Sequence, residues 1–188
     1  GEPLTDDMFA WGFILLMVGG NESTRTGIAH GMRLLMEHPE QLQYLVDHPE
    51  DIPDAIEEML RYNTAFIAMR RTVTQDLEWQ GYQLKKGDKV VLHYHEVKHD
   101  EEVFGEDELV FDIHRKKRMP SLNRELRSFG IGEHFCLGMN LARLEMRVMF
   151  EEILPRIRNP QFAGEVTYMR SFFINTIKAM PITFTPET

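Results

Sequence analysis

The chain has 188 residues, of which 43% are hydrophobic and 27% are charged, enough for one globular domain with a buried core. Its formal net charge of -9 argues against nucleic acid or an anionic membrane surface as a partner. The only cysteine, Cys136, excludes an intrachain disulfide bond. The start of the chain is acidic rather than basic, and its longest apolar run is too short to span a bilayer. These features predict a cytoplasmic protein without a secretory leader or a membrane span.

A long first helix is predicted to begin at Thr5, because threonine caps helix N-termini and Asp6 and Asp7 place acids in the first turn. Residues 8–18 of this helix are apolar on every side. A helix of that kind is normally buried within a larger body, so we expect burial here. Pro39 is expected to end the helix.

Proline and glycine divide the rest of the chain into short elements. Further helices are predicted at residues 40–46, 54–62 and 137–154. Strands are predicted at residues 70–74, 77–84 and 89–94 and within residues 161–186. The segment that follows Phe111, up to Phe129, is predicted to be irregular and basic. The mixture predicts a mainly α fold with a smaller β portion.

The middle of the first helix changes character abruptly. After eleven residues without a charge it carries Gly19 and Gly20, followed by Glu22, Ser23 and Thr24. Each glycine weakens a helix by about 1 kcal/mol relative to alanine, and a carboxylate in apolar surroundings has a desolvation cost. The pattern indicates a local distortion of the helix beside a functional cavity. The alternative is that the helix simply reaches the surface at this point.

Two other groups of polar residues give weak signals on their own. Glu58 and Arg61 lie three residues apart on a predicted helix, a spacing typical of solvated surface pairs that add little stability. His93, His95 and His99 resemble a metal-binding group. Because no fourth ligand lies nearby in the sequence, surface histidines are the favoured interpretation and zinc the alternative.

The glycine-rich segment around the only cysteine is the strongest signal in the sequence. Cys136 lies just before a predicted helix, where the helix dipole and free N–H groups favour a thiolate. Glycines allow the backbone to pack closely against a flat group. The distinctive residues of this segment are Phe129, Gly130, Gly132, His134, Cys136 and Gly138. We interpret Cys136 as a ligand rather than as a small buried apolar side chain.

This segment matches the heme-binding signature of the cytochrome P450 family, Phe-x-x-Gly-x-[Arg/His]-x-Cys-x-Gly, at every specified position. Residues 19–24 resemble the family's oxygen-groove motif, and residues 58–61 match its Glu-x-x-Arg motif. Residues 70–72 and 87–91 follow the pattern of bacterial members. The chain therefore resembles the C-terminal half of a soluble bacterial cytochrome P450, from the central oxygen-groove helix to the C-terminal β segments. Members of the family are about twice as long, which implies that residues 1–188 are one portion of a heme domain whose N-terminal portion is absent.

The resemblance assigns roles to individual residues. Cys136 would be the axial thiolate ligand of the iron in heme b, and His134 and Arg71 would bind the heme propionates. Glu58 and Arg61 would form a buried structural ion pair. The remaining residues beside the cofactor would be Phe129, Gly130, Gly132, Gly138, Gly19 and Gly20.

Oxygen handling and substrate binding are also implied by the resemblance. Glu22 and Ser23, with Thr24, would manage dioxygen and its protons, because a hydroxyl beside a carboxylate can hold water and pass protons. The family usually has threonine at Ser23, and loss of its methyl group implies a less restricted hydroxyl and weaker coupling of oxygen activation. An apolar substrate pocket is implied at Ala65, Phe66, Ile67, Ala68, Phe172, Phe173 and Ile174.

The implied activity is that of a heme-thiolate monooxygenase acting on an apolar substrate that is terpenoid, steroid or fatty-acid-like. Electrons would come from NAD(P)H through a ferredoxin-type partner, since no flavin or iron–sulfur motif is present. A solvated loop or a ferredoxin-docking patch is expected from the basic residues Arg115, Lys116, Lys117, Arg118, Arg124 and Arg127. One alternative is a heme-binding or scaffold fragment without turnover. Another is a peroxide-driven peroxygenase, against which Glu22 and Ser23 argue. Residues 8–18 are expected to self-associate, to pair with the absent portion, or to be unusually exposed.

Overall fold

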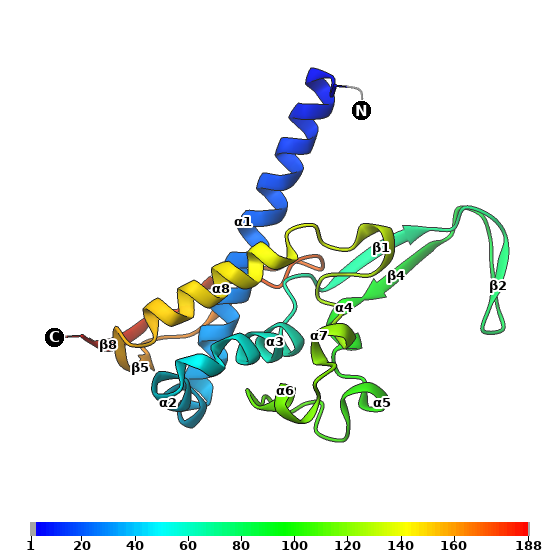
Figure 1. The fold of residues 1–188 in the computed structure, drawn as a ribbon. Helices are drawn as coiled ribbons and strands as arrows, with labels where there is room; N and C mark the ends of the chain where they lie inside the picture. Colours follow the sequence, from blue (N-terminus) through cyan, green and yellow to red (C-terminus); the bar gives the residue numbers. More distant parts are fainter. Residues whose placement is uncertain (1–2, 188) are drawn as a thin grey trace.

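The computed structural model describes residues 3–187, so residues 1–2 and 188 of the predicted domain lie outside the described residues. Its longest element is α1 (Asp6–Glu37), which projects well beyond the rest of the molecule (Figure 1). The predicted cap is present, because the Thr5 hydroxyl accepts a hydrogen bond from the backbone N–H of Met8 at 3.3 Å. The helix ends two residues before Pro39, close to the predicted position.

Three helices form the core of the molecule: the second half of α1, α3 (Ile52–Tyr62) and α8 (Met139–Ile153). Gly31 lets them approach closely, since a Cβ at this position would lie 2.7 Å from the Phe150 ring and 2.8 Å from the Met59 sulfur. The short helix α2 (Pro39–Asp47) and the 3₁₀ turn η1 (Pro49–Asp51) join α1 to α3. The most buried apolar side chains of this core are Leu34, Leu35, Leu45, Ile52, Ile56, Met146 and Phe150.

The strands form antiparallel two-stranded sheets. The pairs are β1 (Ala68–Thr72) with β4 (Lys89–His93), β2 (Leu77–Trp79) with β3 (Tyr82–Leu84), β5 (Ile157–Phe162) with β8 (Ile182–Pro186), and β6 (Thr167–Tyr168) with β7 (Ile177–Ala179). The β2–β3 hairpin extends away from the body (Figure 1). Its turn lies at Gln80 and Gly81, which both have positive φ, as a tight two-residue hairpin turn requires.

The segment between the sheets and α8 is more ordered than its composition predicts. It contains four short helices, α4 (Tyr94–Val97), α5 (Glu101–Phe104), α6 (Arg115–Arg118) and α7 (Leu122–Glu125). The stretch after Phe111 was predicted to be irregular, and this prediction is wrong where α6 and α7 form. Arg115 and Leu122 are completely buried, so α6 and α7 belong to the core rather than to a surface loop.

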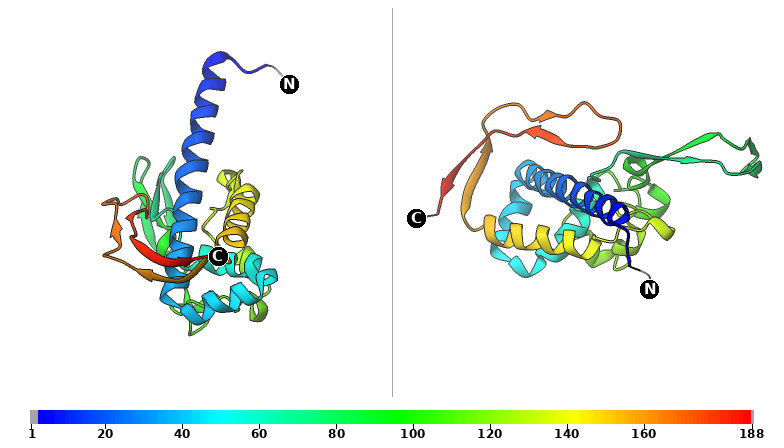
Figure 2. Two further views of the ribbon diagram at one scale, coloured as in Figure 1. Left: turned by 90° about the vertical axis from the view of Figure 1, so that its left-hand side faces the viewer. Right: turned by 90° about the horizontal axis from the view of Figure 1, so that it is seen from above.

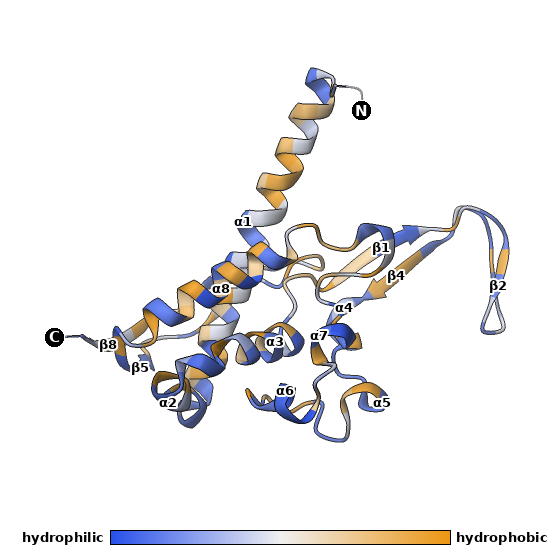
Figure 3. Cartoon of the chain, in the orientation of Figure 1, coloured by the Kyte–Doolittle hydropathy of each residue, from blue (hydrophilic) through white to orange (hydrophobic). Residues whose placement is uncertain are grey.

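The two halves of α1 have different environments: residues 8–18 are unusually exposed, which was one of the expected outcomes, whereas much of the second half is buried. The large apolar side chains of residues 8–18 are 49% to 72% exposed, because no other element within residues 3–187 reaches them (Figures 2 and 3). In the second half the polar residues Thr24, Thr26 and His30 are buried. The distortion predicted at the two glycines is absent, since every residue from Asp6 to Glu37 is α-helical. The described helices include none that is both long and apolar enough to cross a bilayer.

Candidate functional site

Cys136 is exposed in the loop between α7 and α8, a few residues before the first turn of α8. The loop closes on itself, because the backbone N–H of Cys136 donates to the carbonyl of Phe129 at 2.9 Å. Gly130 and Gly132 have φ of 77° and 74°, values that glycine adopts far more readily than other residues. No side chain caps the N-terminus of α8 at Gly138, so the unpaired N–H groups of its first turn give the end nearest Cys136 a positive partial charge.

Two contacts fasten this loop to the helical core. The Ser128 hydroxyl donates to the carbonyl of Leu60 at 2.6 Å, at the end of α3. The guanidinium of Arg143, from α8, lies 4.7 Å from the centre of the Phe129 ring. Arg143 also forms a two-bond pair with the buried carboxylate of Glu57 on α3, at 2.6 and 2.8 Å. The position of Cys136 is therefore set by α3 and α8 together.

Glu58 lies at the centre of a completely buried ionic cluster. Its two carboxylate oxygens accept from Arg61 Nε and Nη2 at 2.7 and 2.8 Å. A second arginine, Arg115 of α6, donates to the same carboxylate from Nε, and Asp112 donates from its backbone N–H at 3.0 Å. The burial excludes the surface-pair interpretation of the Glu58–Arg61 spacing.

The remaining donors of the two arginines bind backbone carbonyls. Arg61 donates to the carbonyls of Lys98, Glu108 and Val110 at 2.7 to 3.1 Å. Arg115 donates to three carbonyls and to the Asp107 carboxylate at 2.7 to 3.1 Å. Each guanidinium thus uses all five of its N–H groups, which is the condition under which buried charges are tolerated. The cluster holds residues 98–112 against α3.

The hydroxyl that contacts the Glu22 carboxylate belongs to Thr176 and not to the neighbouring Ser23. Its Oε1 accepts from Thr176 Oγ1 at 2.9 Å and from Arg25 Nη2 at 2.6 Å. The Ser23 hydroxyl instead donates to the carbonyl of Gly19 at 2.5 Å, within the helix. The expected pairing of Glu22 with Ser23 is therefore not seen. The bond from Arg25, with a smaller contribution from Thr176, holds the pKa of Glu22 below its usual value.

A second hydroxyl extends this contact into the protein. The hydroxyls of Thr176 and Thr26 lie 3.0 Å apart, and both residues are buried. Because Thr176 gives its proton to Glu22, Thr26 is the donor in the bond between them. The result is a short line of hydroxyls that ends on the Glu22 carboxylate. Thr24, the third predicted residue of this group, is buried on the same helix.

The two segments predicted to line a substrate pocket lie side by side. Phe66 and Ile174 form an isolated antiparallel bridge, and the Phe66 and Phe173 rings are 5.0 Å apart. The backbone N–H of Ile67 donates to the carbonyl of Phe173 at 2.9 Å. Phe172 is 86% exposed and Phe173 is 45% exposed, so aromatic surface is available to an apolar ligand.

The basic stretch before the loop is not a continuous positive surface. Arg115 is buried, as described above, so its assignment to a docking patch is wrong. Four other members are paired with acids: Lys116 with Asp54, Lys117 with Asp51, Arg118 with both Asp107 and Asp112, and Arg127 with Glu125. Arg124 and Arg127 lie closest to the loop and line a hollow with Ile131 and Phe135.

The chain is clearly related to known proteins. The family model of cytochrome P450 matches residues 52–159. The chain is 40% identical over 185 residues to the methyl-branched lipid omega-hydroxylase of Mycobacterium tuberculosis, covering 98% of this chain and 42% of that protein. It is 36% identical over 189 residues to a steroid C26-monooxygenase of Mycolicibacterium smegmatis, covering 100% and 45%. This chain belongs to the cytochrome P450 family. It spans less than half the length of the relatives it matches.

The three-dimensional comparison agrees with this assignment. The structure superimposes on the cytochrome P450 CYP109Q5 from Chondromyces apiculatus with a TM-score of 0.90 and 32% identity, covering 100% of this chain and 47% of that one. The predicted P450 resemblance and the predicted fold, the C-terminal part of the cytochrome P450 fold, are confirmed.

The surroundings of Cys136 fit the heme that this P450 family carries. Glycines leave space open to a flat group, since a Cβ added at Gly19, Gly20, Gly132 or Gly138 would meet nothing within 4 Å. The loop and the start of α8 lie beside the middle of α1 (Figures 1 and 2). Large apolar side chains remain exposed in this part of the chain, including Ile131, Phe135, Leu137 and Leu141. A thiolate beside open apolar space suits an iron porphyrin.

The two predicted propionate ligands are accessible in this P450 structure. Arg71 is exposed on β1, and its Nη1 donates only to the carbonyl of the preceding residue, Arg70, at 3.1 Å. His134 is exposed in the 3₁₀ turn η2 (Gly132–His134), two residues before Cys136. Their assignment to the propionates stays a prediction.

Sequence reasoning missed the residues that join distant parts of this P450 chain. Arg115 binds a carboxylate 57 positions away, and Thr176 binds one 154 positions away. The available signal for Arg115 was its place after two apolar residues, Phe111 and Ile113, that are core residues. Nothing in the local sequence of Thr176 distinguishes it from an exposed threonine.

Proposed function

We propose that residues 1–188 are the heme-ligating portion of a single cytochrome P450 heme domain. The whole protein would be a monooxygenase that inserts one oxygen atom of dioxygen into an apolar organic substrate. The observation that carries this proposal is the setting of Cys136, the only cysteine, on a glycine-held loop before the uncapped N-terminus of α8. Its relatives are a lipid hydroxylase and a steroid monooxygenase, which supports this reaction class.

In this proposal Cys136 ligates heme b, and His134 and Arg71 bind its propionates. When bound, the heme supplies the redox chemistry that activates dioxygen, and an axial thiolate favours cleavage of the O–O bond. The protein's own part is to hold the thiolate in place, through the bond from Cys136 N–H to Phe129 and the anchoring of Phe129 beneath Arg143. A cation at Arg71 offsets the negative charge of a propionate.

In this proposal Glu22 and Ser23, at the middle of α1, bind and transfer protons. Glu22 is ionised at neutral pH, because Arg25 and Thr176 both donate to it and lower its pKa. It can accept a proton through the hydroxyls of Thr176 and Thr26 and release it on the Ser23 side of the helix. Ser23 donates to Gly19 in this arrangement, so its hydroxyl must turn before it can bind water.

The substrate is proposed to be terpenoid, steroid or fatty-acid-like. Residues 65–68 and 172–174 supply an apolar wall that includes two aromatic rings in contact at a tilted angle, Phe66 and Phe173. No charged residue lies in either segment, so binding would rest on burial of apolar surface. The relatives' names, which specify a methyl-branched lipid and a steroid, support this substrate class.

Electrons are proposed to come from NAD(P)H through a ferredoxin-type partner. The docking surface is reassigned to Arg124 and Arg127, beside the hollow that Ile131 and Phe135 line. Arg124→Glu should slow electron transfer from an acidic ferredoxin, with a larger effect at low salt. Lys85→Glu, which changes an exposed charge on the distant hairpin, is the matched control. Equal rates for both variants across a salt series would contradict this surface.

Spectroscopy of the reduced, carbon monoxide-bound protein tests the assignment of Cys136. The chain, reconstituted with heme, should give the Soret band of thiolate-ligated iron. Cys136→Ala should lose that band, since the chain has no second cysteine. A thiolate-type spectrum that is unchanged in Cys136→Ala would contradict the proposal.

Heme binding without turnover is the second candidate function. The large apolar surface of residues 8–18 favours it, because the described chain leaves this part of α1 uncovered. Heme-loaded chain that binds carbon monoxide but consumes no NADPH with a ferredoxin system would support this candidate. Substrate-dependent NADPH consumption would exclude it.

A further inference from the structure

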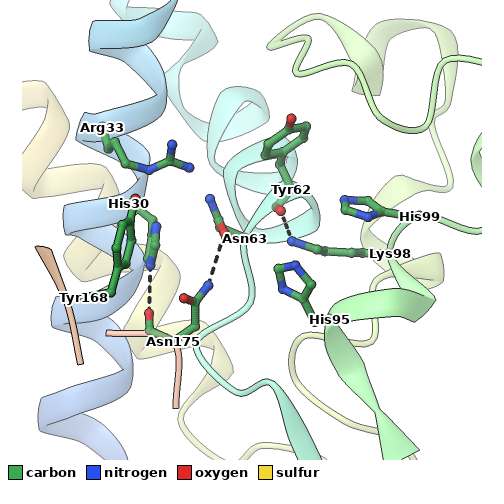
Figure 4. A pocket seen from close by; sticks show the side chains of 9 residues that line it. All are labelled: His30, Arg33, Tyr62, Asn63, His95, Lys98, His99, Tyr168 and Asn175. Carbon is green, nitrogen blue, oxygen red and sulfur yellow. Dashed lines mark hydrogen bonds between the residues drawn. The ribbon is translucent and has the colours of Figure 1, made fainter. Parts of the chain in front are cut away.

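A polar pocket of about 330 Å³ lies between the second half of α1, the end of α3 and the residues that follow β4 (Figure 4). It is distinct from the loop that carries Cys136. Its lining is His30, Arg33, Tyr62, Asn63, His95, Lys98, His99, Tyr168 and Asn175. The sequence predicted surface positions for His95 and His99, but both are partly buried and face this pocket.

The pocket gathers the unpaired nitrogen atoms of the molecule. Within residues 3–187, every buried side-chain nitrogen or oxygen that has no hydrogen-bond partner belongs to this lining, and all are nitrogens. They are His30 Nδ1, Arg33 Nε, Asn63 Nδ2, His95 Nδ1 and His99 Nε2. The arginine and asparagine nitrogens can only donate, and each unpaired buried donor destabilises the fold by roughly 1–3 kcal/mol. The lining therefore offers hydrogen bonds that the protein itself does not accept.

Two lining residues are also cationic, and no carboxylate lies among them. Lys98 is 5% exposed, and its ammonium donates to the carbonyl of Tyr62. Arg33 shares its Nη1 with Glu37, outside the lining, and leaves Nε toward the pocket. Burial, with repulsion from Arg61, lowers the pKa of Lys98 to about 7.

The histidines respond to the same surroundings. Burial lowers the pKa of His30 to about 4, and the neighbouring cations Arg33 and Lys98 act in the same direction. Burial also lowers the pKa of His99 to about 4, with Lys98, His95 and Arg61 acting in the same direction. His30 is 2% exposed and is fixed by a 2.7 Å hydrogen bond between Nε2 and the carbonyl of Asn175, so Nδ1 has no partner in the protein. Because Nε2 donates to the Asn175 carbonyl, Nδ1 of the neutral His30 ring is an acceptor, so the donors that remain for a ligand are those of Arg33, Asn63 and Lys98. A negatively charged ligand would accept from these donors and relieve the repulsion between the cations.

The donor set fits an anion and not a metal ion. Arginine and asparagine side-chain nitrogens have no lone pair to offer a cation. Among the described residues, no three histidine, cysteine or acidic side chains are arranged to hold a metal. A neutral apolar ligand would leave the nitrogens unpaired.

We propose that this pocket binds a small oxyanion, with Arg33, Asn63 and Lys98 as its principal donors. A tetrahedral anion such as phosphate offers acceptor oxygens in several directions, matching donors that come from three separate elements. The pocket volume leaves room for such an ion with water around it. The proposal does not depend on heme or on Cys136.

Calorimetric titration of the purified chain with inorganic phosphate tests this site, with sodium chloride at equal ionic strength as the reference. Phosphate should bind with a stoichiometry of one. Lys98→Met and Arg33→Gln should each weaken binding about tenfold or more, the effect of removing one charged donor. Lys85→Met, which removes an exposed cation on the β2–β3 hairpin, should bind phosphate as the wild type does.

Arg33→Gln complements Lys98→Met, because Arg33 is only partly buried and its replacement leaves the core intact. Weaker binding in Arg33→Gln therefore does not result from a folding defect. Far-UV circular dichroism verifies the fold before each titration. A phosphate nitrogen-15 shift map should place the largest changes on His30, Asn63 and His99. Equal affinity in all variants, or no response to phosphate beyond that to chloride, would overturn the proposal. Because these measurements use heme-free chain, their failure would leave the P450 proposal untouched.

Discussion

Two buried clusters of cations lie beside the end of α3, and they differ in one respect. Around Glu58, the arginines Arg61 and Arg115 place every N–H group on an acceptor. Around His30, five nitrogens of the lining have no hydrogen-bond partner in the described part of the chain: His30 Nδ1, Arg33 Nε, Asn63 Nδ2, His95 Nδ1 and His99 Nε2. Both clusters bury positive charge, but only the first contains the counter-charge. A buried cluster whose N–H groups all have acceptors is structural, whereas one whose donors lack acceptors is a candidate ligand site, even though both bury charge.

The largest expected change in the free energy of unfolding comes from removing Arg61 from the cluster around Glu58. Arg61→Ala removes two of the four N–H donors to the buried Glu58 carboxylate and leaves the Glu108 carbonyl without its arginine donor, so the free energy of unfolding should fall by about 3–5 kcal/mol. Urea unfolding followed by circular dichroism measures this change. Arg118→Ala, which removes an exposed arginine with two acidic partners, should change it by less than about 1 kcal/mol. Equal losses in the two variants would show that saturation is not what stabilises the cluster.

Lowering the pH should reduce the free energy of unfolding through the cluster around His30. The pKa of His30 is about 4 in the fold, below its ordinary value of 6.5. Between these pH values the unfolded chain binds more protons, so the free energy of unfolding falls as the pH drops from 6.5 to 4. The contribution of His30 is on the order of 3 kcal/mol. His30→Gln should flatten the measured pH dependence, whereas the exposed His48→Gln should not.

Removing the cation Lys98 from the cluster around His30 should raise the free energy of unfolding, whereas Arg61→Ala lowers it. Lys98→Met replaces a desolvated ammonium by an apolar chain of similar length, so the free energy of unfolding should rise by roughly 2 kcal/mol at pH 6. The gain should shrink above pH 7, because Lys98 then loses its proton in the folded protein. Urea midpoints at pH 6 and pH 9 measure this difference. A loss of stability at pH 6 would mean that the hydrogen bond to Tyr62 outweighs desolvation.

The smallest expected effect concerns the hydroxyls that lead to Glu22. Thr176→Val keeps the side-chain shape but removes the donor to Glu22 and the acceptor for Thr26, at about 1 kcal/mol of stability. The pKa of Glu22 should rise toward its usual value, since one of the bonds that lower it is lost. Carbon-13 NMR titration of the Glu22 carboxyl measures the shift. Thr185→Val on the exposed strand β8 should leave that titration unchanged.

The sequence predicts those parts of the molecule that local rules determine. Thr5 with two acids gives the start of α1, the two-residue turn at Gly81 gives a hairpin, and the motif around Cys136 gives the loop before α8. Each depends on residues within ten positions of one another. The type and order of the longer helices and of the strands could therefore be predicted, with boundaries two or three residues away from those in the structure, whereas the short helices α4 to α7 were missed.

Features that depend on distant segments could not be predicted in this way. Burial of residues 8–18 was expected from their composition, yet burial requires a covering segment, and the described chain provides none. Arg115 looked like part of a charged surface, because its partner Glu58 is far away in the sequence. Lys98 gave no signal at all, since a lysine is normally exposed and its burial follows from the path of residues 94–99 across α3.

Asn175 and Thr176, which immediately precede β7, contact two separate polar sites. The carbonyl of Asn175 fixes His30 in the polar pocket, while the next residue, Thr176, donates to Glu22. Linkage is reciprocal: if an anion in the pocket changes the pKa of Glu22, protonation of Glu22 must change the affinity for that anion by the same factor. Two adjacent residues thus give the acid on α1 and the polar pocket a common backbone support.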